Sequence, residues 1–202
     1  MPESIAQGFL LIDKPAGMTS HDVIDRLRHV LKTRQIGHAG TLDPFATGLL
    51  LVGVGPKTKE LQQYVGLDKV YEATFLLGAD SETDDPEGPI TIREVTRWPT
   101  QEEIEAAIKT FTGEIEQTPP TYSAIKIKGK KMYEAAREGK PLVAPPRKVT
   151  VYSFEMVPSP SASDKDTREL RVRIHCSSGT YIRALARDLG AKLGVGGYVS
   201  EL

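Results

Sequence analysis

The order of helix and strand patterns along the chain constrains its fold more than any other feature. Apolar residues recur at helical spacing in three segments, residues 19–31, 100–113 and 182–194. Strand patterns occur in five segments, residues 9–12, 49–54, 71–77, 149–156 and 169–176. Because these segments do not alternate in a regular βαβ rhythm, the sequence predicts an α+β fold rather than a doubly wound parallel sheet.

Two of the predicted helices begin with a recognisable cap. Thr19 and Asp22 have the spacing of a capping box, in which two side chains satisfy amides that lack helical partners. Thr100 and Glu103 repeat that spacing. The apolar face of this second helix is predicted to run to Phe111, with the next glycine, at position 113, as its stop.

The remaining segments predict strands and loops of a single domain. Residues 169–176 alternate apolar with polar side chains, which predicts a half-buried strand with one polar face. Residues 84–89 (DDPEGP) predict an exposed turn, and residues 159–166 predict a hairpin loop. Neither loop is long enough to separate two domains, so residues 1–202 are predicted to form one.

The composition excludes several classes of protein. The chain has 202 residues, of which 39% are hydrophobic, too many for a disordered segment. No apolar stretch is long enough to cross a bilayer, and residues 1–8 lack the basic and apolar regions of a secretory signal. Cys176 is the only cysteine, which excludes an intramolecular disulfide framework. We expect a soluble, cytoplasmic protein that does not act on membranes.

Charge is distributed unevenly along the chain, although the net charge is only −1. Residues 126–148 contain eight lysines or arginines and two glutamates, whereas residues 80–87 contain five acids and no base. Such segregation is typical of a protein with one face that attracts polyanions. Two ordinary solvated faces would give the same counts, so both interpretations stay open from composition alone.

Residues 37–48 (GHAGTLDPFATG) form the segment with most bearing on chemistry. Three glycines and a proline within twelve residues predict a loop of demanding backbone geometry, followed directly by an apolar strand. Asp43 is its only carboxylate, and His38 is its only other titratable group. An aspartate before proline is more often a turn residue than a nucleophile, so the residues alone leave both roles open.

Four further motifs occur in order along the chain, at residues 13–20 (DKPAGMTS), 69–73 (KVYEA), 119–126 (PPTYSAIK) and 176–183 (CSSGTYIR). Together with residues 37–48 they resemble the bacterial tRNA pseudouridine 55 synthases, the TruB family. The resemblance implies a pseudouridine synthase fold, with a mixed, mainly antiparallel sheet, flanking helices and a central active-site cleft. It also implies isomerisation of uridine 55 in the T-loop of tRNA, with the target base flipped out of the stack.

Roles for individual residues follow from the resemblance. It implies that Asp43 is the catalytic aspartate, that Arg183 pairs with it, and that Tyr71 stacks on the target uracil. The positions that match pocket residues of the family are His38, Tyr181 and Leu202. Lys14 and Pro15 are expected to brace the active-site loop.

Pseudouridine formation explains why a carboxylate is needed. The bond between ribose C1′ and uracil N1 breaks, the base turns, and it rejoins through C5, so that no atom is lost and no cofactor is implied. A carboxylate can attack C1′, as in a retaining glycosidase, or attack C6 of the base, or abstract a sugar proton to give a glycal. The sequence does not choose among these routes.

The basic stretch is expected to bind the tRNA T-arm. The proposed contacts to the RNA backbone are Lys126, Lys128, Lys130, Lys131 and Arg147. The histidines outside the loop have neither the spacing nor the cysteines of a zinc site, so no metal is expected. We expect a monomer that needs neither a guide RNA nor a protein partner.

The resemblance implies that the family commonly continues beyond the residue that matches Leu202 with a small carboxy-terminal RNA-binding domain, which we expect to be absent here. Two alternatives to a stand-alone isomerase stay open. One is an RNA-binding module of the same fold that does not catalyse, and the other is a guide-RNA-dependent pseudouridine synthase. Intact Asp43, Tyr71 and Arg183 argue against the first.

Overall fold

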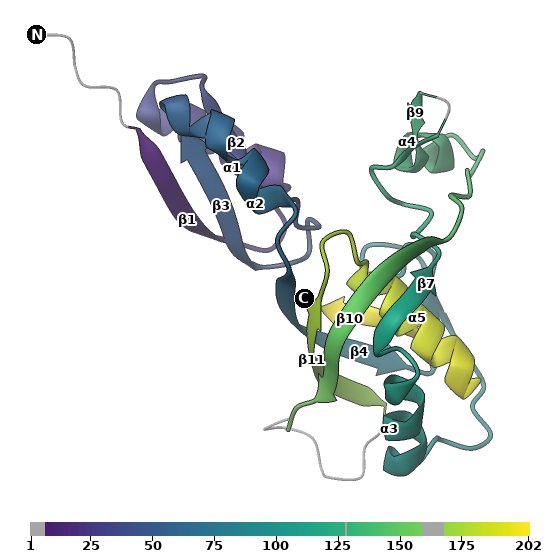
Figure 1. Cartoon of the computed structure of the whole chain (residues 1–202). Helices are drawn as coiled ribbons and strands as arrows, with labels where there is room; N and C mark the ends of the chain where they lie inside the picture. The colour runs from purple at the N-terminus through teal and green to yellow at the C-terminus, as the bar shows by residue number, and fades with distance from the viewer. Residues whose placement is uncertain (1–6, 128, 159–167) are drawn as a thin grey trace, which may run out of the picture. The chain divides into compact units, whose positions relative to one another are not determined.

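Strands of two separate sheets dominate the computed structural model, which describes residues 7–127, 129–158 and 168–202 (Figure 1). The chain divides into two compact units, Met1–Leu67 and Asp68–Leu202. The prediction that residues 1–202 act together as one catalytic domain stays a prediction. The hairpin loop expected at residues 159–166 lies outside the described residues.

The first unit is a small sheet packed against one helix. Its antiparallel strands lie in the order β1 (Gly8–Lys14), β3 (Gly48–Val54) and β2 (Ile36–His38). Val23 and Ile24 of α1 (Ser20–Leu31) pack with Leu50 and Val52 of β3 to form its core. The capping box of Thr19 and Asp22 is confirmed. Two short helices follow β3, η1 (Gly55–Glu60) and α2 (Gln62–Val65).

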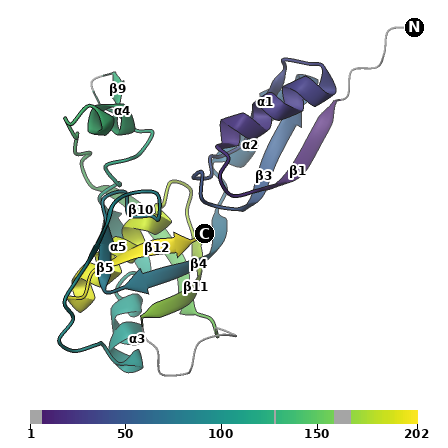
Figure 2. The ribbon, with the colours of Figure 1, turned by 180° about the vertical axis from the view of Figure 1, so that it is seen from behind.

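The second unit is built on a five-stranded sheet in which every neighbouring pair is antiparallel. The strands lie in the order β12 (Gly197–Glu201), β4 (Lys69–Leu77), β11 (Glu169–Cys176), β10 (Arg147–Met156) and β7 (Gly113–Gln117). The helix α5 (Ile182–Leu193) packs against β12 and β4, and α3 (Gln101–Lys109) packs against α5 and β10 (Figure 2). Mixed helices and antiparallel sheets confirm the α+β prediction.

Short elements complete the second unit. The strands β5 (Ala79–Ser81) and β6 (Ile90–Ile92) form a hairpin after β4. Between β7 and β10 the chain forms the strands β8 (Lys126–Ile127) and β9 (Lys130–Lys131) and the helix α4 (Met132–Arg137) (Figure 1). Among the described residues, no helix combines the length and the apolar character needed to cross a membrane.

The three predicted helices and five predicted strands are present, with one correction, whereas the shorter elements were not predicted. In β11 the residues Leu170, Val172 and Ile174 are buried and Arg173 is exposed, which confirms the alternating pattern. The helix α3 ends at Lys109 instead of reaching Phe111. It ends early because the amide and the hydroxyl of Thr110 both donate to Ala107 O, at 3.0 and 2.7 Å, which tightens the last turn.

Candidate active site

The backbone on both sides of Asp43 is held by side chains from other segments. Ser20, buried at the start of α1, accepts a hydrogen bond from Leu42 N at 2.9 Å and donates to Leu42 O at 3.3 Å. On the other side, Pro44 O accepts from Lys14 Nζ at 3.1 Å and from Gly17 N at 2.9 Å. Asp43 itself is half-buried. The loop therefore presents its carboxylate from a backbone that is anchored at the two neighbouring residues.

Lys14 is the central anchor of this loop. Its side chain is fully buried, and its ammonium group donates to Pro15 O at 3.0 Å and to Met18 O at 2.6 Å, as well as to Pro44 O. A buried ammonium group is stable only when its donors are satisfied, so three converging carbonyl groups explain why a lysine occupies this place. Lys14 braces the loop, as the resemblance implies.

His38 ends β2 at the point where the loop begins. It is half-buried, and its Nδ1 forms a hydrogen bond with Gly40 O. Gly40 has a φ of 112°, a conformation that favours glycine and lets the loop turn back on the histidine. This bond orients the imidazole ring, whereas its contact with RNA stays a prediction.

The other predicted site residues belong to the second unit. They lie near one edge of its sheet, the edge at which β4 begins and β11 ends. In the antiparallel ladder Cys176, the last residue of β11, lies opposite Lys69, the first residue of β4. Tyr71 lies opposite Ile174, so it occupies the buried face of the sheet near that edge. From Cys176 the chain passes through residues 177–181 into α5. The short strand β12 also runs toward this edge and ends opposite Thr74, just before Leu202.

Tyr181, the residue before α5, is fixed by two neighbours. The buried side-chain amide of Gln117 donates to Tyr181 O at 2.9 Å and accepts from Tyr181 N at 2.7 Å. The guanidinium group of Arg147 lies over the Tyr181 ring, 4.7 Å from its centroid, and donates to Gly179 O. Arg147 was predicted only as a contact to the RNA backbone, and the structure gives it this role beside Tyr181 as well. Sequence reasoning did not identify Gln117.

Arg183 is buried in a network formed within the second unit. Its Nη1 donates to Thr83 O at 2.8 Å and to Asp85 Oδ2 at 3.0 Å, and its Nη2 donates to Tyr122 O at 3.1 Å. The other oxygen of Asp85 accepts from the Thr83 hydroxyl and from Glu87 N. The side chains of Arg183 and Asp85 are only 5% and 4% exposed, and these extra hydrogen bonds are what such a buried ion pair requires.

The turn predicted at residues 84–89 is present and exposed at Pro86, Glu87 and Pro89, but the network corrects the prediction for its first two residues. Asp84 and Asp85 are 8% and 3% exposed. An exposed turn was expected from its prolines and glycine, and carboxylates are rarely buried without a cationic partner. Here the partners are Arg183 and Arg187 of α5, which lie about a hundred residues further along the chain.

Burial of Asp84 has an electrostatic consequence. Burial raises the pKa of Asp84 to about 6, because loss of solvent outweighs the attraction of Arg187 and Arg183. Burial also raises the pKa of the Cys176 thiol, which agrees with a small buried side chain rather than a nucleophile.

Comparison with known proteins decides the family. The model of the TruB family pseudouridylate synthase (N terminal domain) matches residues 28–182. The chain belongs to the TruB family. Proteins called tRNA pseudouridine synthase B from Corynebacterium efficiens and Leifsonia xyli subsp. xyli are both 49% identical to it, over 96% and 98% of the chain. The one from Thermobifida fusca is 46% identical over 98% of the chain. The chain spans about two thirds of the length of these relatives, from 65% to 68%.

Solved structures give the same family fold. A chain in a Cbf5–Nop10–Gar1 complex aligns with a TM-score of 0.71 and 30% identity, over 96% of this chain and 46% of that one. A chain in an H/ACA RNP bound to a substrate RNA containing 2'-deoxyuridine aligns with a TM-score of 0.67 and 28% identity, over 96% and 45%. The pseudouridine synthase fold predicted from the motifs is therefore confirmed.

The predicted TruB-family residues fall in both units. Asp43 and His38 belong to the first unit, and Tyr71, Tyr181 and Arg183 belong to the second. The pairing of Arg183 with Asp43 and the central cleft stay predictions. What the structure adds to the family motifs is an acidic partner of Arg183 at Asp85. The only sequence signal for it was the cluster of acids at residues 80–87, which does not show which acid is buried.

Some lysines of the basic stretch of this TruB-family chain are paired within the protein, so fewer are available to bind RNA than its composition suggests. Lys130 pairs with Glu138, and Lys131 lies 3.7 Å from Glu134 and donates to the hydroxyl of Tyr133. Lys126 and Lys140 are exposed, and Lys128 lies outside the described residues. Part of the predicted positive charge is thus neutralised within the protein.

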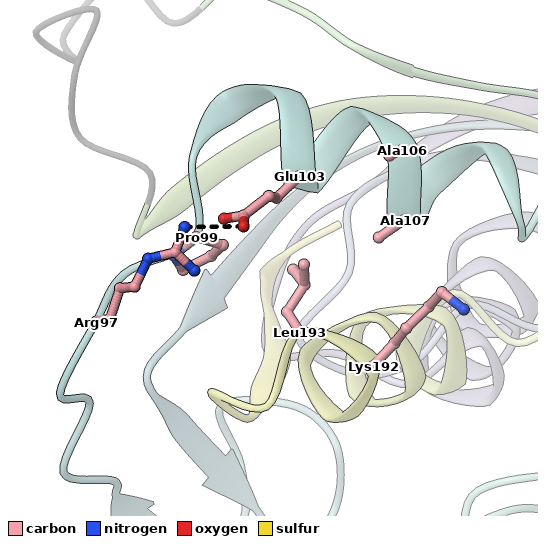
Figure 3. Close-up of a pocket in the computed structure, with 7 residues that line it drawn as sticks. All are labelled: Arg97, Pro99, Glu103, Ala106, Ala107, Lys192 and Leu193. Carbon is pink, nitrogen blue, oxygen red and sulfur yellow. Dashed lines mark hydrogen bonds and ion pairs between the residues drawn. The ribbon is translucent and has the colours of Figure 1, made fainter.

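A groove elsewhere in the second unit contains none of the predicted residues. It has a volume of about 400 Å³ and is lined by Arg97, Pro99, Glu103, Ala106, Ala107, Lys192 and Leu193 (Figure 3). Arg97 and Glu103 form a salt bridge of 2.8 Å across part of it. Within residues 7–127, 129–158 and 168–202, no group of three or more potential ligands could hold a metal ion.

Proposed function

We propose that this chain converts uridine 55 in the T-loop of tRNA to pseudouridine, with Asp43 as the catalytic carboxylate. The observation that carries the proposal is the anchored loop around Asp43, in which Ser20 and Lys14 hold the backbone on both sides of the loop's only carboxylate. A reaction that relies on one carboxylate needs that group to be placed accurately. The motifs shared with relatives called tRNA pseudouridine synthase B support the choice of substrate.

The chemistry follows from the reaction itself. An ionised Asp43 can attack ribose C1′ or uracil C6, or remove a sugar proton, and all three routes lead to release of N1 and formation of a bond through C5. A positive charge close to the carboxylate keeps it ionised when solvent is excluded, and this is the role of Arg183. Asp85 in turn orients the Arg183 guanidinium group.

The target base must leave the RNA stack to reach the carboxylate. Tyr71 is placed on the buried face of the sheet near the edge where α5 begins, and it is suited to stack on the flipped uracil. Tyr181, Leu202 and His38 complete the pocket for the surrounding nucleotides. Gln117 holds the backbone of Tyr181 and Arg147 lies over its ring, which supports a contact that loses little entropy on binding.

The chain is proposed to act without a guide RNA or a protein partner. Its identity to the relatives called tRNA pseudouridine synthase B is 46–49%, against 28–30% to chains solved in Cbf5 and H/ACA complexes. Activity of the purified chain on tRNA alone tests this point together with the reaction.

The test of the function uses an unmodified tRNA transcript and the purified chain. Carbodiimide-adduct primer extension after incubation should give a single new stop, which reports pseudouridine at position 55. A folded sample that binds the transcript and produces no stop would contradict the proposal and favour an RNA-binding module.

Replacing Tyr71 with leucine should slow turnover about 10-fold to 100-fold, because stacking of one base contributes about 1–3 kcal/mol. The fold should persist, since Tyr71 is only half-buried. Single-turnover rates of Tyr71→Leu and Tyr71→Phe distinguish ring from hydroxyl. A Tyr71→Phe variant with near wild-type rate supports stacking alone, and full activity of Tyr71→Leu would remove the stacking role.

Reversing the two exposed lysines of the basic stretch, in a Lys126→Glu and Lys140→Glu double variant, should weaken tRNA binding. The slope of log affinity against log salt should become shallower by roughly 0.7–0.9 for each phosphate group that the variant no longer binds. A matched control reverses Lys109 and Lys192, near the ends of α3 and α5. Equal effects in the two double variants would mean that only the net charge of the protein affects tRNA binding, and that the basic stretch is not a specific binding surface.

A further inference from the structure

Arg187 repeats, one helical turn later, the contacts of Arg183. Arg183 joins the acidic turn at residues 81–88 to Tyr122 O, through its bonds to Thr83 O and Asp85. Arg187 donates to Asp84 Oδ2 at 2.9 Å and to Thr118 O at 2.9 Å, so it joins the same turn to the segment just before Tyr122. Two arginines on one face of α5 therefore fasten the same two segments side by side.

Asp84 holds the turn at its backbone as well as at its side chain. Its φ is 61°, a left-handed conformation that is uncommon for a residue other than glycine and that persists only when the surroundings enforce it. Its carbonyl oxygen accepts from Val199 N of β12 at 3.2 Å. The turn is thus tied to β12 through Asp84 and to α5 through the neighbouring pairs at Asp84 and Asp85.

We propose that the Asp84–Arg187 ion pair is a positioning device, which keeps the Asp85 carboxylate in register with Arg183. The role rests on the proposed function, since it serves the arginine that is proposed to pair with the catalytic carboxylate. Neither Asp84 nor Arg187 is assigned a contact with the reacting atoms. The pair acts through the turn: without it, the turn loses its Asp84 side-chain link to α5, and the Asp85 carboxylate and the Arg183 guanidinium group are positioned less accurately.

Burial disfavours the charged form of the Asp84 carboxylate. The charged groups that face it are Arg183, Arg187 and Asp188 of α5 and the adjacent Asp85, while β12 contributes a backbone amide. Because burial raises the pKa of Asp84 to about 6, the proton is held more tightly in the folded than in the unfolded chain. The contribution of Asp84 to the free energy of unfolding therefore falls as the pH rises from about 4 to about 6. The rate should depend on pH in the opposite direction. If the ion pair positions Asp85, activity needs ionised Asp84 and therefore rises over the same pH range.

The experiment compares Asp84→Asn with the wild-type chain in single-turnover conversion of tRNA at saturating protein, between pH 5.5 and 8. The matched control is Asp80→Asn, which removes the charge of a partly exposed acid of the adjoining strand β5, paired with Arg93. At pH 7.5 we expect the Asp84→Asn rate to be lower by about 10-fold to 100-fold, with tRNA affinity within about twofold of the wild type. The ratio of wild-type to Asp84→Asn rate should shrink as the pH falls below about 6, whereas Asp80→Asn stays close to the wild type.

Two further readouts separate positioning from stability. Relative to the wild type, Asp84→Asn should gain free energy of unfolding as the pH rises from about 4 to about 6, while its rate falls further behind, so stability and rate change in opposite directions. Arg187→Lys, which keeps the charge but not the fork, should retain more activity than Arg187→Met. A constant rate ratio at all pH values, or equal losses in Asp84→Asn and Asp80→Asn, would overturn the positioning role. A wild-type chain that makes no pseudouridine would instead refute the proposed function.

Discussion

Asp43→Asn is expected to abolish pseudouridine formation, by at least about 10³-fold in single-turnover rate, while tRNA binding stays within about twofold. The substitution keeps the size of the side chain and removes its negative charge, and each of the three possible routes needs that charge. The loop should keep its shape, because Ser20 and Lys14 hold the backbone at Leu42 and Pro44 and not at Asp43.

A control in the same unit shows whether the loss is specific. Asp25 is an exposed acid of α1 that pairs with Arg28, so Asp25→Asn removes a charge of the same kind without touching the loop. It should leave the rate close to the wild type. Measurable turnover by Asp43→Asn, with tRNA bound at wild-type affinity, would refute its assignment as the reacting carboxylate.

Arg183→Met is expected to cost both activity and about 3–5 kcal/mol of stability, because it leaves the Asp85 carboxylate buried without its cationic partner. Two backbone oxygens, of Thr83 and Tyr122, also lose a donor. Urea unfolding followed by tryptophan fluorescence measures the loss, since Trp98 is the only tryptophan of the chain and lies in the second unit.

Two variants test the physical reason for that loss. Arg183→Met combined with Asp85→Asn should recover part of the stability, because the buried charge disappears, but none of the activity. Arg173→Met removes an exposed arginine from the neighbouring strand and should change stability by less than about 0.5 kcal/mol. An Arg183→Met protein as stable as Arg173→Met would show that the buried pair contributes nothing to folding.

Features that depend on a few neighbouring residues were predictable. The capping boxes at Thr19 and Thr100 lie where their spacing placed them, because a cap needs only the first turn of its own helix. The alternation in β11 identified its buried face, because successive side chains of a strand point to opposite faces of the sheet. The end of α3 was missed because Thr110 binds Ala107 O through its hydroxyl, a choice that apolar periodicity does not register.

In the candidate site, too, features that depend on neighbouring residues were predictable and contacts between distant residues were not. The glycine-rich loop, its single carboxylate and the family motifs are properties of the sequence, and they were enough to select Asp43, Tyr71 and Arg183. The clamp of Gln117 on Tyr181 was not predictable, since it joins residues 64 positions apart and an isolated glutamine carries no signal of its partner.

The sequence by itself determined the three long helices, the five longest strands, the loop around Asp43 and the family. Only the tertiary structure decided which acids are buried. Asp84 and Asp85 stand among prolines and glycines that favour a solvated turn, and they become buried because α5 brings Arg187 and Arg183 against them. The cost of burying a carboxylate depends on what replaces its water, and for Asp85 that replacement comes from a residue 98 positions away in the chain.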